Sequence, residues 1–241
     1  MNRFQQLTPE ILNLLQSTDT CSVSNAIETL NLRMRDEGYL QRQLQCLLPD
    51  LPPVAGYAIT GRIRTAAPPV AGLCYYQRSD WWEHVARYPG PKILAVSDMD
   101  RAPASAAFVG EIHAEIARAL NCVAYVSNGS IRDLPALERM KFQCLAGGVS
   151  VSHAYAHLVD FGEPIEIAGL KIATGDILHA DRHGVLSIPP ESLTSLSGAL
   201  QKICDREREL IRLCRAPNFT IGRLLAALDG EDSLCLPQSL P

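Results

Sequence analysis

The chain has 241 residues, 47% of them hydrophobic and 20% charged, which is enough apolar material to bury a sizeable core. A formal net charge of −4 argues against binding nucleic acid through a basic face. The sequence has no apolar run of about 18 residues and no N-terminal signal core, so we expect a cytoplasmic protein without a membrane span.

The N-terminal region predicts two helices and a strand. Pro9 follows Thr8, a residue that can cap, and this order is typical of a helix start. Ser22 or Ser24 is expected to cap a second helix. Residues 54–66 alternate well enough to predict a strand, which the prolines after it would end.

Aromatic side chains gather in the next stretch, where a short helix is predicted around Trp81 to Arg87. The favoured interpretation is that these rings pack on the core. The alternatives are a wall beside a substrate and a contact between subunits. The rings belong to Tyr75, Tyr76, Trp81, Trp82 and Tyr88.

The middle of the chain predicts strands that alternate with helices. A strand over 92–100 is followed by a loop to Val109, a helix over 110–120 and a strand over 122–126. The polar residues 127–130 are expected to form a turn that ends this strand. This alternation indicates an α/β fold.

The predicted secondary structure changes twice in the C-terminal part, first to short strands and then to helices. One or two helical turns are expected after Asp133, and then a strand over 142–151 that Gly147 and Gly148 break. A β-rich block begins at residue 164, and a long amphipathic helix and a shorter one follow it. We therefore divide the chain into an α/β domain over 1–190 and a helical extension over 191–241, packed on the core or on a neighbouring subunit. The last residues are expected to be loose or swapped onto a neighbour.

Polar groups converge between Gly110 and Asp133. Asp133 is a hard oxygen ligand suited to Mg²⁺ or Mn²⁺, and magnesium needs only one or two carboxylates because it keeps several waters. Arg132 can hold an oxyanion in a planar, two-pronged way. Glu111 could orient metal-bound waters, so the predicted catalytic residues are Glu111, Arg132 and Asp133.

The start of the predicted helix adds a place for an anion. Gly110, Glu111, Ile112 and His113 form its first turn, where amide groups without a helical partner attract a carboxylate. Together with Arg132 these residues could bind an α-keto acid. The His113 side chain either touches substrate or is simply a satisfied polar group, and the second interpretation is favoured.

Other polar residues give weaker signals. Residues 181–184 lie between strands and indicate a turn more than a site. His153 and His157 have a spacing that can bind metal on a helix, but no acid lies nearby in sequence. Cys144 lies in an apolar run without an evident partner, which argues against a nucleophile. The eight cysteines form no CxxC pairs, which favours reduced thiols over disulfides or zinc.

These motifs resemble those of the RraA-like family. The family's signature is an acid, 20 further residues and then Arg-Asp, as in Glu111 and Arg132-Asp133. The segments CSVSNAIETL, VAGYAIT and GDILHADRHGVLSIP are similar to its other conserved stretches. The likeness extends from about residue 18 to 190. The family includes pyruvate aldolases acting on 4-hydroxy-4-methyl-2-oxoglutarate and 4-carboxy-4-hydroxy-2-oxoadipate, and the regulator of ribonuclease activity A.

The resemblance implies a swivelling β/β/α sandwich, here with extra C-terminal helices, assembled as a homotrimer or hexamer with sites between subunits. It implies that Asp133 holds Mg²⁺ or Mn²⁺, that Arg132 binds the pyruvyl keto oxygen and that Glu111 holds waters on the metal. The implied activity is that of a metal-dependent lyase that cleaves a 4-hydroxy-2-oxo acid to pyruvate, with oxaloacetate decarboxylation as a side activity. The alternative is a regulatory protein without catalysis that masks a partner such as a ribonuclease.

The chain also departs from the family pattern. Asn25 and Asn128 stand where the family usually has aspartate, and the stretch 75–91 is longer than in compact members. Some family aldolases use a further acid from the neighbouring subunit. Several C-terminal acids are candidates for it: Glu191, Asp205, Glu207 and Glu209.

Overall fold

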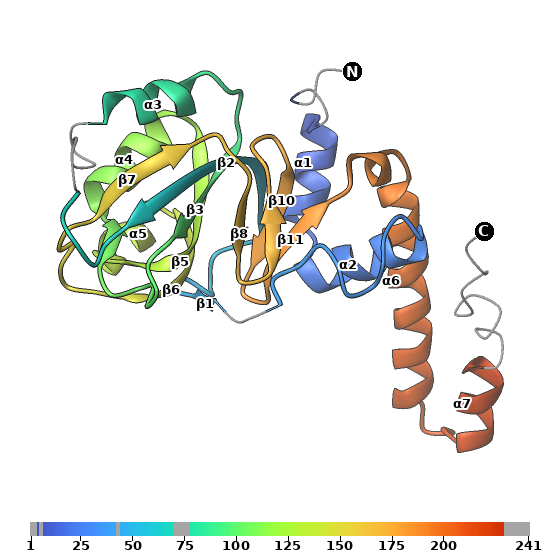
Figure 1. Cartoon of the computed structure of the whole chain (residues 1–241). Coiled ribbons are helices and arrows are strands. Elements are labelled where there is room, and N and C mark those ends of the chain that lie inside the picture. Colours follow the sequence, from blue (N-terminus) through green and yellow to red (C-terminus); the bar gives the residue numbers. More distant parts are fainter. Residues whose placement is uncertain (1–3, 5–6, 42–43, 70–77, 229–241) are drawn as a thin grey trace.

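A large mixed sheet forms the centre of the fold in the computed structural model, which describes residues 4, 7–41, 44–69 and 78–228 (Figure 1). Along its main path the strands follow the order β1-β6-β5-β3-β2-β10-β11, while β4 pairs with β5 and β7 with β2. The strands are β1 (Gln45–Cys46), β2 (Val54–Arg64), β3 (Lys92–Asp98), β4 (Ala107–Val109), β5 (Cys122–Ile131), β6 (Gln143–Val149), β7 (His157–Phe161), β10 (Ile177–Asp181) and β11 (Gly184–Ile188).

The strands β2, β3, β5 and β6 run parallel to one another. In β3, Leu94 and Val96 face one core, and Ile93 and Ala95 face another. A strand buried on both faces reads as a continuous apolar run, which is why the sequence over 92–100 predicted it so directly.

Each face of the sheet carries its own layer. The helices α3 (Ser79–Ala86), α4 (Glu111–Ala119) and α5 (Leu134–Arg139) lie over one face. A hairpin of β8 (Ile165–Ile167) and β9 (Leu170–Ile172) covers the other. The order of layers is therefore the β/β/α sandwich expected from the resemblance.

A third core lies under the N-terminal helices and the start of α6. The helices α1 (Pro9–Gln16), α2 (Thr20–Thr29) and α6 (Leu193–Arg215) pack there against β2 and β11. Thr8 caps α1 as predicted. The predicted caps of α2, Ser22 or Ser24, were wrong by three or five residues: its cap is Asp19, which accepts a hydrogen bond from the Ser22 amide at 2.9 Å.

The C-terminal helices leave the body of the molecule (Figure 1). Leu193, Leu196 and Leu200 bury the beginning of α6, whereas Ile211 near its end is exposed. The helix α7 (Ile221–Leu228) packs beside α6 and has no buried residue. The predicted loose or swapped tail over 229–241 lies outside the described residues.

Two predicted breaks in strands do not occur. The polar residues 127–130 were expected to end a strand, but β5 continues through them to Ile131. Side chains make this possible: Asn128 accepts a hydrogen bond from the Asp98 amide at 2.7 Å and donates one to its carbonyl at 2.9 Å. Likewise β6 continues through Gly147, where a Cβ atom would lie 2.2 Å from the Asn128 carbonyl oxygen.

The aromatic stretch packs as the favoured interpretation expected. Trp81 on α3 is buried in the core beside Phe161, with ring centroids 5.7 Å apart. Trp82 packs against the core from the edge, and so does Tyr88. Tyr75 and Tyr76 lie outside the described residues.

His153 lies in a loop and His157 begins β7, so the two residues do not share a helix. Their spacing therefore does not place them as a metal-binding pair on one helix face. The described cysteines are free thiols, while Cys74 and Cys235 lie outside the described residues. Within the described part of the chain, no helix is long and apolar enough to cross a membrane.

Candidate functional site

The site lies where parallel strands end. The strand β4 leads through Gly110 into α4, and β5 leads through Arg132 and Asp133 into α5. The two strands pair in parallel, and the Arg132 amide donates a hydrogen bond to the Val109 carbonyl at 3.0 Å. This pairing brings together two segments that are far apart in sequence. They meet at the C-terminal ends of parallel strands, where α/β proteins commonly bind ligands.

Asp133 is held in a defined position. Its backbone is left-handed, with φ 60° and ψ 37°, which an aspartate tolerates better than most residues. Its Oδ2 accepts a hydrogen bond from the Glu111 amide at 3.0 Å. A Cβ atom on Gly110 would lie 2.4 Å from this oxygen, so the close approach requires glycine. The carboxylate thus sits at the positive end of α4.

Arg132 lies beside this carboxylate. Its Nε is 3.4 Å from Oδ2 of Asp133, and the two side chains are 34% and 39% exposed. Both groups are therefore anchored on one side and open to solvent on the other. A small anionic molecule could reach the guanidinium and the carboxylate together.

Glu111 points elsewhere in this structure. Its carboxylate pairs with Arg139 of α5 at 3.6 Å, and both side chains are well exposed. The expected role of Glu111, orienting waters near Asp133, would require it to leave this surface ion pair. Exposed pairs contribute little stability, typically below about 1 kcal/mol, so such a movement is inexpensive.

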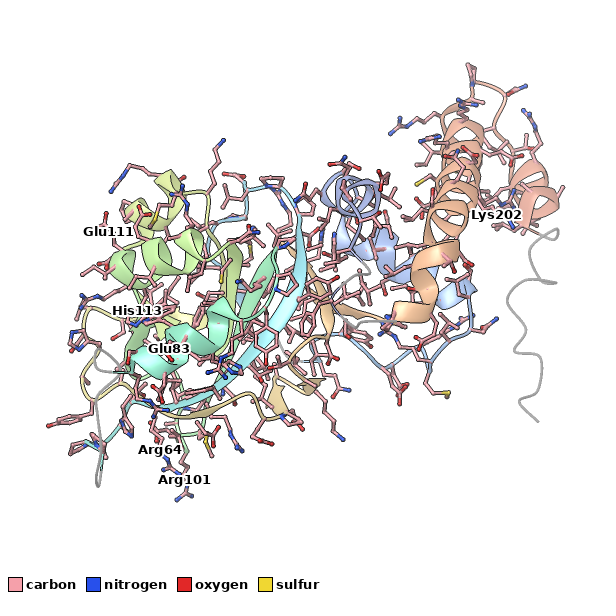
Figure 2. The ribbon with its side chains drawn as sticks, turned by 90° about the horizontal axis from the view of Figure 1, so that it is seen from above. Arg64, Glu83, Arg101, Glu111, His113 and Lys202 are labelled. Carbon is pink, nitrogen blue, oxygen red and sulfur yellow. The ribbon has the colours of Figure 1, made fainter. Side chains whose placement is uncertain are left out.

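His113 lies beneath the site, only 6% exposed, whereas its neighbour Ile112 is 67% exposed. The His113 ring packs against Trp82 and Phe108, with centroids 5.5 and 5.2 Å away. Burial first, and then the charges of Arg132 and His153, lower the pKa of His113 to about 4. The ring is therefore neutral near pH 7, and it supports the start of α4 from below (Figure 2).

The donor set fits a hard cation better than zinc. Asp133 supplies one partly open carboxylate, which matches the requirement of Mg²⁺ or Mn²⁺ for few protein ligands and several waters. In the described part of the chain, the one cluster of three metal-ligand side chains lies elsewhere, at Asp19, Cys21 and His183. Asp133 thus supplies a ligand of the type that the expected metal prefers, and water would have to supply most of the other ligands.

The acids of the C-terminal extension lie far from this site in the same chain. Asp205, Glu207 and Glu209 are on α6, and Figure 2 shows Lys202 of that helix at the opposite end of the molecule from Glu111. These acids could reach an Asp133 site only on a neighbouring chain.

The sequence predicted that Gly110, Glu111, Arg132 and Asp133 lie together. The structure places Gly110, the Glu111 amide, Arg132 and Asp133 side by side, whereas the Glu111 carboxylate pairs with Arg139. It places Ile112 outward and His113 beneath. Arg139 and Trp82 were missed as neighbours, because their positions depend on how α5 and α3 dock on the sheet.

The RraA-like family model, described as Aldolase/RraA, matches residues 20–187. The match covers well over half of the chain. This chain belongs to the RraA-like family. The segments that match include both halves of the site, since Gly110 and Asp133 lie within the matched range, and the family assignment agrees with the three-layer fold.

Solved structures confirm the RraA-like fold. An uncharacterized protein from Pseudomonas syringae pv. tomato is 18% identical, with a TM-score of 0.71 over 92% of this chain and 96% of that one. A protein described among novel cellulases from gut-associated microbes is 19% identical, with a TM-score of 0.66 over 85% and 90%. Streptomyces coelicolor RraAS2, an unusual member of the RNase ES inhibitor RraA family, is 16% identical, with a TM-score of 0.64 over 87% and 98%.

Proposed function

We propose that the protein is a divalent-metal-dependent lyase that cleaves a small 4-hydroxy-2-oxo acid to pyruvate. The observation that supports this most is the Asp133 carboxylate, held by the Glu111 amide at 3.0 Å with Arg132 beside it at 3.4 Å. A fixed carboxylate and a guanidinium, both half open, suit a molecule with a carboxylate next to a keto oxygen.

Asp133 would hold Mg²⁺ or Mn²⁺, and the cation would supply Lewis-acid polarisation of the keto acid. Arg132 binds the keto oxygen of the substrate. When a water molecule takes the proton of the 4-hydroxyl group, C4 becomes the carbonyl carbon of the second product and the C3–C4 bond breaks. Its electron pair forms the C2–C3 double bond of the enolate, and the keto oxygen takes the negative charge. The guanidinium stabilises that negative charge, and protonation at C3 then gives pyruvate. The same charge develops when oxaloacetate loses carbon dioxide, which makes decarboxylation an expected side activity.

The first turn of α4 orients the other end of the same molecule. The amides of Ile112 and His113 lie in the first turn of α4, whose Glu111 amide contacts Asp133, and a helix start favours a substrate carboxylate. Neutral His113 beneath them adds no positive charge. Glu111 would hold waters near the cation once its carboxylate leaves Arg139.

The test is pyruvate release from a panel of 4-hydroxy-2-oxo acids, with purified protein and Mg²⁺ or Mn²⁺. Asp133→Ala is expected to abolish metal-dependent turnover, and Arg132→Ala to reduce it on the order of 10²-fold or more. Arg118→Ala, an exposed change on α4 in a pair with Glu115, is the control and should leave turnover unchanged. Absence of turnover across the panel with metal bound would contradict the proposal.

An exposed apolar surface near the site supports assembly into the expected homotrimer or hexamer. Val149 at the end of β6, together with Val151 and Tyr155 in the next loop, is largely exposed. Exposed apolar clusters commonly mark protein interfaces. Light scattering after gel filtration should give three or six chains, and Val151→Asp should shift the protein towards single chains.

The same surface supports the second candidate, a regulatory protein that masks a partner such as a ribonuclease. The two candidates differ in their need for Asp133. If the protein is a regulator, Asp133→Ala should leave capture of the partner unchanged, and Val151→Asp should abolish it. A pull-down with both variants, run beside the turnover assay, separates the two functions.

A further inference from the structure

A second group of ligand-type side chains lies outside the Asp133 site. Asp19 caps α2, Cys21 belongs to the first turn of that helix, and His183 lies in the turn between β10 and β11. A carboxylate oxygen, the thiol sulfur and a ring nitrogen of these residues all lie within 4.8 Å of one another. A carboxylate, a thiol and an imidazole are the three side-chain types that zinc uses.

Asp181 fixes the two segments that carry these side chains. Its buried carboxylate accepts hydrogen bonds from the Thr20 amide at 2.9 Å and the His183 amide at 2.7 Å. The helix start and the hairpin turn are therefore joined before any ligand binds.

The same carboxylate orients the His183 ring. Nδ1 of His183 lies 3.1 Å from Oδ1 of Asp181, while the side chain is 48% exposed. This leaves Nε2 as the ring atom available to a ligand. A histidine whose second nitrogen bonds to a carboxylate is the arrangement that metal-binding histidines commonly show.

The surroundings of Cys21 are electrically negative. The Asp19 carboxylate lies within 4.8 Å of the Cys21 sulfur. A cation is attracted by that negative charge and would bind the sulfur as the thiolate. A thiolate with an imidazole selects a borderline-soft ion such as zinc over magnesium.

A cavity of about 260 Å³ adjoins the cluster. Cys21 and His183 line it, and Glu28, Arg35 and Tyr39 form other parts of its wall. The wall thus carries one acid, one guanidinium and a phenol, so the space suits a small polar ligand. A metal with three protein ligands keeps a further position open, which here would face this cavity.

We infer that Asp19, Cys21 and His183 form a binding site for a Zn²⁺-class ion, whose open position takes water or a small anion in the adjoining cavity. The three side chains come from two segments that Asp181 already joins, so binding requires small side-chain movements. The site is independent of the Mg²⁺ or Mn²⁺ site at Asp133 and of the proposed lyase activity.

Co²⁺ binding to the full-length protein tests this inference, because a cobalt–thiolate bond gives a charge-transfer absorption that carboxylates do not. The wild-type protein and Cys214→Ser, which removes an exposed thiol on α6, are expected to show the band with one equivalent of Co²⁺. Cys21→Ser should lose it. His183→Ala should weaken Co²⁺ binding by more than the roughly 10–100-fold that loss of an outer-shell partner costs. A band that survives Cys21→Ser overturns the inference.

Alkylation of the wild-type protein gives a second test that does not depend on a variant folding. The rate at which iodoacetamide modifies Cys21 and Cys214 is followed by peptide mass spectrometry, with and without Zn²⁺. Zn²⁺ should slow modification of Cys21 at least about tenfold, because the bound thiolate is no longer a free nucleophile, and leave Cys214 unchanged. Equal rates at Cys21 in both conditions also overturn the inference.

Discussion

The amide of Glu111 donates a hydrogen bond to Oδ2 of Asp133 across 3.0 Å, although the two residues are 22 positions apart. Gly110 permits this approach, since any side chain there would begin within contact distance of the same oxygen. The start of α4 and the start of α5 are thereby joined through a group that is also the expected metal ligand.

Gly110→Ala should therefore damage the site more than the fold. The new Cβ would lie 2.4 Å from Oδ2 of Asp133 and 3.1 Å from Arg132, so both side chains must shift. We expect loss of Mn²⁺ binding and turnover, with a decrease of about 1–3 kcal/mol in the free energy of unfolding. Calorimetric Mn²⁺ titration and urea unfolding measure the two effects.

Gly198→Ala is the matched control for this change. Gly198 lies within α6, and a Cβ there would meet nothing within 4 Å. Alanine should raise the free energy of unfolding by up to about 1 kcal/mol and leave Mn²⁺ binding unchanged. If both variants bound Mn²⁺ like the wild type, the close approach of Gly110 to Asp133 would not be needed for metal binding.

Asn128→Asp tests why the chain has an amide where the resemblance leads us to expect an acid. Asn128 must donate to the Asp98 carbonyl and accept from the Asp98 amide, and an aspartate cannot donate. Burial above all raises the pKa of the nearby Asp98, so a second negative charge is unfavourable. The substitution should cost about 1–3 kcal/mol of unfolding free energy. Asn218→Asp, in an exposed loop, should cost nothing measurable by urea unfolding.

His113 should make stability depend on pH. Its pKa in the folded protein is about 4, below the ordinary value of 6.5. Between these two pH values the unfolded chain therefore binds a proton at His113 that the folded protein does not bind. Stability from this group is full above pH 6.5 and is lost as the pH falls towards 4, by about 3 kcal/mol in all. Urea unfolding across this range should show a flatter pH dependence for His113→Gln. An unchanged slope would contradict the assignment.

The two ends of α6 should differ in their effect on stability. Leu196 is buried against the N-terminal helices, so Leu196→Ala should lower the free energy of unfolding by about 2–5 kcal/mol. Ile211 on the same helix is exposed, and Ile211→Ala should change it by less than about 0.5 kcal/mol in the single chain. A larger effect at Ile211 that depends on protein concentration would show that this end contacts another chain.

Local signals explain what the sequence predicted well. Thr8 and Pro9 define the start of α1 through a cap and a fixed backbone angle, both set by neighbouring residues. The apolar run of β3 is explained by burial on both faces. Gly110, Arg132 and Asp133 were singled out because they lie at a predicted helix start or after a predicted strand and turn, and because they match a family motif; the strand β4 that pairs with β5 and joins them was not predicted.

Long-range contacts explain what the sequence did not predict. The strand β5 continues through Asn128 because that side chain bonds to a residue of a neighbouring strand. Glu111 pairs with Arg139 because α5 docks beside α4. His183 was interpreted as a turn residue, which it is, but its position beside Cys21 depends on the packing of α2 against β10 and β11. None of these pairings leaves a trace in the local sequence pattern.

An irregular step in β5 lies shortly before Arg132 and Asp133 of the candidate site. From Ser127 to Ser130 the strand advances by three residues, while its partner β6 advances by two, from Ala146 to Gly148. Side chains alternate between the two faces of a strand. The one extra residue therefore reverses the face to which each later side chain of β5 points. Deleting Gly129 alone would therefore send Ser130 and Ile131 to the opposite faces of the sheet, and it would alter the strand end from which Arg132 and Asp133 follow without changing either residue.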